Sequence, residues 1–188
     1  MLRRFFKRSF DILFSLFIIL FVFSWLYPIL AILIKLESKG PVFFVQLRTG
    51  RNNMHFKCYK FRSMRVNGDA DKKQATLNDH RITRIGAFMR KTSLDEIPQL
   101  FNVLNGDMSL VGPRPPLANE VGKYELEHFR RLEVLPGITG LWQVRARQDP
   151  SFHRYVALDL AYVENWSFWL DFKILIKTAG VVLRGTGW

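Results

Sequence analysis

The sequence predicts an α+β protein that is mostly helical and monotopic, with a re-entrant N-terminal membrane segment built as helix, break and helix. Three observations predict this class: an uncharged apolar run near the N-terminus that contains a proline, two short strand-like segments that suit a small β-hairpin, and amphipathic helical patterns in the remainder. The 188 residues suit one domain, with 1–40 as the membrane segment and 41–188 as the cytoplasmic, membrane-associated part.

The membrane segment is the run from Ile12 to Ile34. It is long enough to cross a bilayer, because its 23 residues reach roughly 34 Å as a helix. Pro28 removes a backbone donor and clashes with the preceding turn, which predicts a sharp bend with a break at Ser24–Pro28. Both flanks are cationic, so the positive-inside rule places both ends on the cytoplasmic face. The cations counted are Arg3, Arg4, Lys7 and Arg8 before the run and Lys35, Lys39, Arg48 and Arg51 after it. An ordinary span with a tolerated proline kink is the alternative.

The formal net charge of +12 predicts an anionic partner. Beside an apolar membrane segment this favours membrane lipids or a phosphorylated substrate over nucleic acid, and no base-stacking aromatic motif lies among the basic residues. Cys58 is the only cysteine, so no internal disulfide forms, and its apolar–basic surroundings predict a buried thiol. The four histidines lack metal-ligand spacing.

The remaining elements follow in order. Pro41–Leu47 and His55–Phe61 read as strands of a hairpin joined by Arg48–Asn53, and Val66–His80 reads as a polar surface loop. Helices are expected at Arg81–Lys91, Ser93–Leu104, Pro116–Leu135, Ser151–Glu164 and Trp166–Leu183. The last of these is amphipathic and suits the headgroup plane or the protein core, and its apolar face suits lipid or a second copy of the chain in a homodimer. Trp166, Trp169 and Trp188 are expected as interfacial anchors, and Asp159 and Asp171 as structural residues.

The densest signal for chemistry is Arg90–Pro115, RKTSLDEIPQLFNVLNGDMSLVGPRP. Ser93 and Glu96 have the spacing of a capping box, and Pro98 offers a competing first helical position. Either start puts Asp95 and Glu96 in the first turn of a helix or just before it, where free amides keep carboxylates ionised. Adjacent helical side chains point ~100° apart, so we expect one acid to attack or bind a metal and the other to assist.

Cations surround these acids in the sequence. Arg90 precedes Asp95 by five residues, and the turn Gly112–Pro115 fixes Arg114 on a rigid backbone. Lys60 and Arg62 flank Phe61. Fixed cations around an ionised carboxylate suit phosphoryl transfer. The alternative is that these cations only bind lipid headgroups.

These residues resemble the bacterial sugar transferases, the small monotopic phosphoglycosyl transferases that start glycan assembly on polyprenyl phosphate. The matching features run in order along the chain. They are a basic N-terminus, an apolar segment with Pro28, KFRSM at Lys60–Met64, the Arg90–Pro115 motif, PGITGLWQV at Pro136–Val144, and an aromatic amphipathic C-terminal helix. Members often carry serine directly before the re-entrant proline, where this chain has Tyr27, so the bend rests on Pro28.

The resemblance implies an enzyme at the cytoplasmic face of the bacterial inner membrane. It implies transfer of sugar-1-phosphate from a UDP-sugar to undecaprenyl phosphate with release of UMP, an early step in making exopolysaccharide, lipopolysaccharide or capsule. It further implies that Asp95 is the nucleophile and a ligand of Mg²⁺, and that Glu96 assists. The phosphate-binding positions it suggests are Lys60, Arg62, Arg90 and Arg114, and Arg147 is a candidate for the nucleotide. A non-catalytic basic scaffold on the membrane surface is the alternative function.

Overall fold

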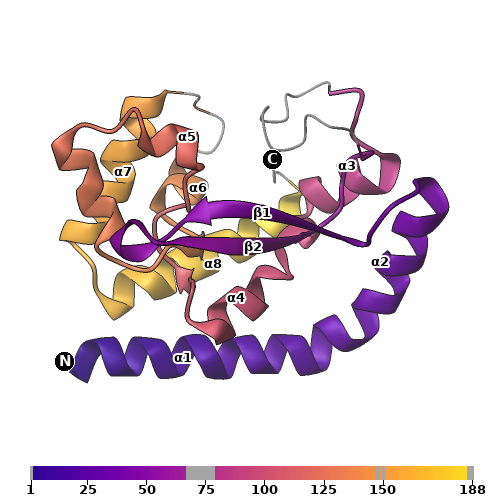
Figure 1. Cartoon of the computed structure of the whole chain (residues 1–188). Helices are drawn as coiled ribbons and strands as arrows, with labels where there is room; N and C mark the ends of the chain where they lie inside the picture. Colours follow the sequence, from indigo (N-terminus) through magenta and orange to yellow (C-terminus); the bar gives the residue numbers. More distant parts are fainter. Residues whose placement is uncertain (1, 67–78, 147–148, 150, 186–188) are drawn as a thin grey trace.

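The computed structural model describes residues 2–66, 79–146, 149 and 151–185. A long bent helix runs along one edge of the molecule, and the other elements lie on its concave side (Figure 1). The helices are α1 (Leu2–Ile18), α2 (Ser24–Glu37), α3 (Arg84–Lys91), α4 (Gln99–Asn105), α5 (Ala118–Val121), α6 (Leu141–Arg145), α7 (Phe152–Glu164) and α8 (Phe168–Arg184). The strands are β1 (Phe43–Thr49), β2 (His55–Phe61), β3 (Ser109–Val111) and β4 (Gly137–Thr139). The mostly helical α+β class and the β1–β2 hairpin are confirmed.

The predicted break at Ser24–Pro28 is wrong, because the chain stays helical through Pro28. The axis changes direction between α1 and α2 (Figure 1), where the π-helical segment Ile19–Phe23 joins them. Helices change direction at π-helical turns as well as at prolines, so the π-helical segment accounts for the position of this bend. Two side chains bind carbonyls of this segment: Ser24 Oγ donates to Leu20 O at 2.6 Å, and Trp25 Nε1 donates to Phe21 O at 2.9 Å. The bend therefore lies in a continuous helix.

An aromatic stack fixes this bend against the hairpin. Phe23 and Tyr27, from the helix, lie 5.4 Å apart between ring centroids. Phe23 stacks on Phe61 at 5.8 Å, and Tyr27 stacks on Phe43 at 5.6 Å. Phe61 is almost fully buried at 1 % exposure. Tyr27 thus fills a packing position in this chain, which gives a structural reason for an aromatic residue before Pro28.

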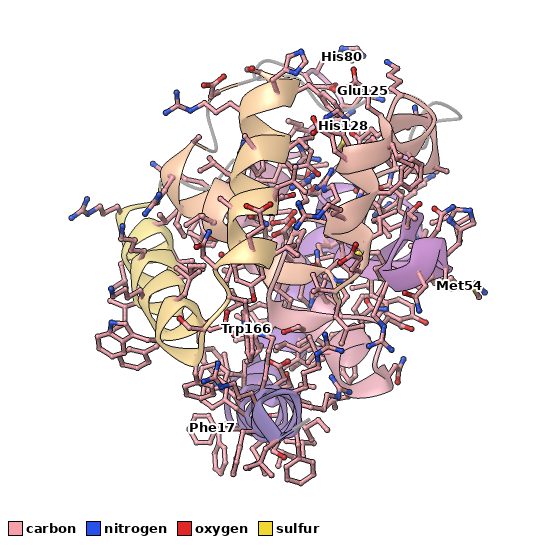
Figure 2. The ribbon with its side chains drawn as sticks, turned by 90° about the vertical axis from the view of Figure 1, so that its left-hand side faces the viewer. Phe17, Met54, His80, Glu125, His128 and Trp166 are labelled. Atoms are coloured by element: carbon pink, nitrogen blue, oxygen red, sulfur yellow. The ribbon has the colours of Figure 1, made fainter. Side chains whose placement is uncertain are left out.

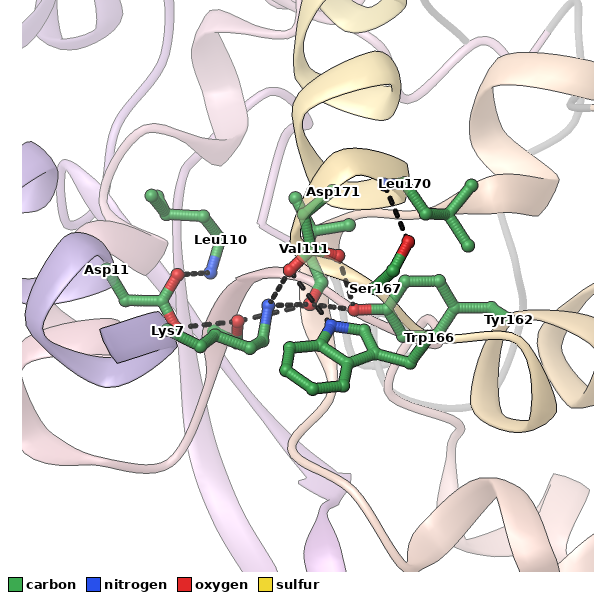
Figure 3. Close-up of polar contacts among 10 residues, drawn as sticks. Lys7, Asp11, Leu110, Val111, Tyr162, Trp166, Ser167, Leu170 and Asp171 are labelled. Atoms are coloured by element: carbon green, nitrogen blue, oxygen red, sulfur yellow. Dashed lines mark hydrogen bonds and ion pairs between the residues drawn. The ribbon is translucent and has the colours of Figure 1, made fainter. Parts of the chain in front are cut away.

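The polar face of α1 binds strand β3 and helix α8 (Figure 3). Lys7 Nζ pairs with Asp171 Oδ2 at 2.6 Å and donates to Val111 O at 3.1 Å. Asp11 Oδ2 accepts from Ser109 Oγ at 2.7 Å. These contacts confirm the structural role expected for Asp171. They also show that Lys7, counted above among the cations that set topology, is bound inside the protein.

Two other cations from that count have internal partners. Arg8 donates to the carbonyls of Met108 and Leu104, at 3.3 and 3.2 Å. Arg48 is buried in the hairpin and belongs to the site described below. Trp166 is partly buried, and its Nε1 donates to Asp171 Oδ2 at 3.1 Å, so part of this side chain packs within the protein. Trp188 lies outside the described residues.

The outer surface of the bent helix is apolar. The continuous helix Leu2–Glu37 is long and apolar enough to cross a membrane, by length and composition. Its side chain Phe17 lies at the opposite end of the molecule from Glu125 and His128 (Figure 2). Helix α8 packs beside α1 through Phe10 and Phe168, whose ring centroids lie 5.7 Å apart. The large apolar side chains exposed on these helices include Leu13, Phe17, Leu20, Phe21, Trp25 and Ile32, with Phe168, Trp169, Phe172 and Ile176 on α8.

Replacing Phe61 by alanine tests the aromatic stack. We expect Phe61→Ala to lower the free energy of unfolding by about 3–5 kcal/mol, because it removes a buried ring and leaves a cavity. Phe17→Ala is the matched control, since Phe17 is 54 % exposed. Denaturant unfolding in detergent micelles measures both. Equal effects of the two substitutions would contradict the packing role of Phe61.

Candidate active site

Asp95 and Glu96 lie in a short 3₁₀ turn, Leu94–Glu96, ahead of helix α4. The predicted capping box is wrong: Ser93 adopts left-handed φ and ψ of 56° and 18°, and its side chain makes no capping hydrogen bond. The single helix expected over Ser93–Leu104 is accordingly split, and α4 begins after Pro98. The two acids therefore precede the helix, which is one of the two placements the sequence allowed.

The two acids differ in environment. Asp95 is 7 % exposed, whereas Glu96 is partly exposed and pairs with Lys60, whose Nζ lies 2.6 Å from Glu96 Oε1. Burial lowers the pKa of the Arg90 guanidinium, and attraction to Asp95 opposes that shift. Arg90 is also oriented by Ser63, because its Nε donates to Ser63 Oγ at 2.9 Å. Glu96 thus has the Lys60 ammonium group as its partner, and Asp95 lies close enough to the Arg90 guanidinium group to act on its pKa.

A pocket lies beside Glu96, between the hairpin, α4, α6 and the Gly112–Pro115 turn. Its charged lining consists of Arg48, Lys60, Arg114 and Glu96. Burial opposes the charge of Arg114, but Glu96 heads a set of groups that outweigh burial and raise the pKa of this guanidinium. Three cations against one acid favour an anionic ligand such as a phosphate group.

Arg48 is a site residue that the sequence analysis missed. It lies at 7 % exposure, and its Nη1 donates to Pro115 O at 3.0 Å. Its Nη2 donates to Gln46 Oε1 at 2.6 Å. Burial and then the charge of Arg114 lower the pKa of Arg48, which places the two guanidinium groups in one electrostatic field. The hairpin pattern could have identified Arg48. Phe44 pairs with Lys60, and side chains alternate along a strand, so residues 44, 46 and 48 lie on the same face of the hairpin as Lys60.

Arg62, which was also expected to bind substrate, does not line this pocket. The Arg62 guanidinium donates to the carbonyls of Lys39 and Ser38, the latter at 2.8 Å, and so binds the chain at the end of α2. The side chain predicted to bind substrate thus caps the membrane helix and ties it to the hairpin. Arg147 lies outside the described residues.

Close backbone packing fixes the turn that carries Arg114. Strand β3 pairs in parallel with β4, and the turn after β3 lies against the chain after β4. A Cβ atom on Gly137 would lie 2.1 Å from Gly112 N, and one on Gly140 would lie 2.2 Å from Gly112 O. No side chain fits at either position, so the glycines of the Pro136–Val144 motif let the two backbones touch.

A buried ion pair supports the same turn from the other side. Arg131 pairs with Asp159, and both side chains are fully buried. Arg131 Nη2 also donates to Arg114 O at 3.0 Å, and Tyr155 Oη donates to the same carbonyl at 3.3 Å. The structural role expected for Asp159 is confirmed. The single helix expected over Pro116–Leu135 is wrong, because this stretch forms α5 followed by the 3₁₀ segment Leu126–Leu132, which carries Arg131.

Carboxylates for a metal ion are present at two places among the described residues. Asp95 and Glu96 supply two hard oxygen donors from adjacent residues, of which Glu96 lines the cationic pocket, and one or two carboxylates suit Mg²⁺ when substrate phosphates complete its shell. Glu125, Glu127 and His128 form a three-residue group with ligand atoms within 4.8 Å of one another. Glu125 and Glu127 are exposed, and none of the three lines the pocket. The donor set of the first place fits a metal shared with a phosphorylated substrate.

Substitution of Asp159 tests the support of the Arg114 turn. We expect Asp159→Asn to lower the free energy of unfolding by about 3–5 kcal/mol, because it leaves the charge of Arg131 buried without its acid. Glu164→Gln is the control, since it removes an exposed pair with Arg130 and costs about 1 kcal/mol or less. Chemical denaturation monitored by tryptophan fluorescence measures both. If Asp159→Asn lowers the free energy of unfolding by less than Glu164→Gln does, the buried pair does not stabilise the region around the Arg114 turn.

Known proteins resemble the chain over almost its whole length. The family described as Bacterial sugar transferase matches residues 2–185. A galactosyl transferase, CpsE, of Streptococcus agalactiae is 49 % identical over 80 % of this chain and 36 % of its own length. A UDP-galactose-lipid carrier transferase of Erwinia amylovora is 46 % identical over 98 % of this chain and 42 % of its own length.

A shorter relative gives a match over most of both proteins. The exopolysaccharide production protein ExoY of Rhizobium meliloti is 42 % identical over 96 % of this chain and 87 % of its own length. The chain spans about two fifths of the length of the first two relatives. The family match covers the membrane helix, the acid turn, the Arg114 turn and α8, so the chain belongs to the bacterial sugar transferase family.

Proposed function

We propose that this chain transfers sugar-1-phosphate from a UDP-sugar to undecaprenyl phosphate and releases UMP. The observation that carries the proposal is the acid pair Asp95–Glu96 set between Lys60 and the guanidinium groups of Arg90, Arg114 and Arg48. Relatives named as a UDP-galactose-lipid carrier transferase and an undecaprenyl-phosphate galactose phosphotransferase support this choice of substrates.

In this proposal Asp95 is the nucleophile. One oxygen of its carboxylate attacks the phosphorus that carries the sugar, and the bond from that phosphorus to the UMP oxygen breaks. The sugar phosphate is then bound covalently to Asp95. In the second step a phosphate oxygen of undecaprenyl phosphate attacks the same phosphorus, and the carboxylate leaves. Each step forms one P–O bond and breaks one, and the two-step route lets a water-soluble donor and a lipid acceptor use one site in turn.

The surrounding side chains stabilise charge in both steps. Arg114 and Arg48 face the pocket and suit the oxygens of the diphosphate, whose charge grows on the leaving UMP. Lys60 pairs with Glu96 at 2.6 Å and so places an ammonium group next to the residue that follows the nucleophile. Arg90 lies in the field of Asp95 and orients the attacking carboxylate. A Mg²⁺ ion held by Asp95 and Glu96 would supply further positive charge to the phosphate oxygens.

The membrane helix suits a site that must meet a lipid phosphate. We propose that the bent helix is re-entrant, with both ends at the cytoplasmic face of the inner membrane and the apolar faces of α1 and α8 in lipid. The polar side of α1 is filled by Lys7, Asp11 and their partners, so only its apolar side is left for the bilayer. The exposed apolar side chains of α8 lie beside this surface, which favours lipid over a second copy of the chain as their neighbour.

Release of UMP from a UDP-sugar tests the chemistry. With UDP-galactose, Mg²⁺ and undecaprenyl phosphate, we expect Asp95→Asn to lower the rate of UMP release by about a thousandfold or more, because the nucleophile is lost. With UDP-galactose alone, the intact mass of the wild type gains a phosphosugar that Asp95→Asn lacks. Glu164→Gln serves as the folded control. Unchanged UMP release by Asp95→Asn would rule out this nucleophile, and no release from any UDP-sugar would favour the non-catalytic scaffold.

Cysteine labelling tests the topology. Arg4 and Lys39 are both exposed and lie at the two ends of the bent helix. In a Cys58→Ala background, we expect Arg4→Cys and Lys39→Cys to react with an impermeant thiol reagent from the cytoplasmic side only. Labelling of the two positions from opposite sides would instead mean that the helix crosses the membrane.

A further inference from the structure

Gln143 has a buried amide oxygen with no hydrogen-bond partner among the described residues. The residue lies in α6, within the Pro136–Val144 motif, and is 8 % exposed. An enclosed carbonyl oxygen without a donor has lost the hydrogen bond that water gave it in the unfolded chain. Such a group in a native structure calls for an explanation, and a donor that arrives with a ligand is one explanation where the group lines a pocket.

The position of this amide identifies the kind of ligand. Gln143 lines the same pocket as Glu96, Lys60 and Arg114. Its Oε1 lies so close to Gly140 that a Cβ atom there would approach it to 2.8 Å, so glycine leaves room for the amide in this orientation. The arginines and lysine match phosphate oxygens, but an ionised phosphate cannot donate to an amide oxygen. If a phosphorylated ligand supplies the partner of Gln143, that partner is a donor group next to the phosphates and not the phosphates themselves.

A hydroxyl group fits this requirement best. It donates to the amide oxygen and also accepts from the amide nitrogen, so it satisfies the side chain in either orientation. A sugar nucleotide carries hydroxyl groups on both sides of its diphosphate, on the hexose and on the ribose. The acceptor lipid offers only phosphate oxygens and a hydrocarbon chain, with no hydroxyl group.

We infer that Gln143 binds a hydroxyl group of the sugar nucleotide and is a specificity-determining residue for the donor substrate. This inference rests on the proposed function, because it assigns a contact within the same reaction. It makes the neutral amide the part of the pocket that distinguishes a glycosylated diphosphate from a simple phosphate. The hydroxyl belongs to the hexose or to the ribose, and both have the same chemistry at this position.

Gln143→Met tests the contact, because methionine has a similar length and no hydrogen-bonding amide. We expect the KM for UDP-galactose to rise about tenfold, the size of effect that one lost hydrogen bond gives. The KM for undecaprenyl phosphate should stay within twofold. Asn119→Leu is the matched control, since it removes an exposed amide from α5. A KM for UDP-galactose within twofold of the wild type, or an equal rise for the lipid, would overturn the inference.

Two further measurements separate the sources of the hydroxyl. If the ribose supplies it, the inhibition constant of UMP rises with the KM in Gln143→Met. If the hexose supplies it, the inhibition constant of UMP is unchanged in Gln143→Met. One deoxyhexose analogue then binds the wild type more weakly than UDP-galactose does, whereas Gln143→Met binds the two equally. Both results support the inference. The analogue series also serves if Gln143→Met fails to fold: equal KM values for wild type across deoxyhexose and 2′-deoxyuridine analogues would overturn it.

Wild-type UMP release is measured first. A wild type that releases UMP while Gln143→Met keeps its KM removes only the role of Gln143. A wild type that releases no UMP from any UDP-sugar overturns the proposed function and this inference together.

Discussion

The buried pair between Arg131 and Asp159 is the interaction on which the cationic wall of the pocket depends. A guanidinium group removed from water needs an acid and further acceptors. Here Asp159, two tyrosine hydroxyls and the carbonyl of Arg114 accept from the two terminal nitrogens of Arg131, while its Nε has no partner among the described residues. Such a pair adds little net stability compared with an apolar core. What it supplies is one fixed position for the backbone of Arg114, with the glycine contacts of Gly112 holding the other side of the turn.

The same turn is connected to the membrane helix. Lys7 binds the carbonyl of Val111, the residue directly before Gly112, and Asp11 binds Ser109 at the start of that strand. Strand β3 thus lies between the long apolar helix and the arginine that faces the pocket. The Asp11 contact is buried and the Lys7 contact is partly buried. These contacts connect the position of α1 to the position of the turn that carries Arg114.

Sequence patterns predicted the elements whose contacts are local. Alternation gave the hairpin, and helical periodicity gave α3, α7 and α8 close to their observed bounds. Two acids at a helix start are common, and this pair was singled out by the cations around it in the sequence and by the family motif that carries it. Patterns could not find the parallel pairing of β3 with β4, since these strands have three residues each and lie far apart in the chain. Sequence patterns also misassigned Arg62 and Arg48. The partners of Arg48 depend on the register of the hairpin, and the partners of Arg62 depend on where the end of α2 lies.

The proximity of Arg48 to Arg114 has a consequence for the resting protein. Two guanidinium groups that share one pocket repel each other, and this repulsion contributes to the lowered pKa of Arg48. A neutral side chain at either position would remove this repulsion. A bound anion would also offset it, because a negative charge attracts both guanidinium groups. The two like charges therefore give the pocket a preference for negatively charged ligands over neutral ones of the same shape.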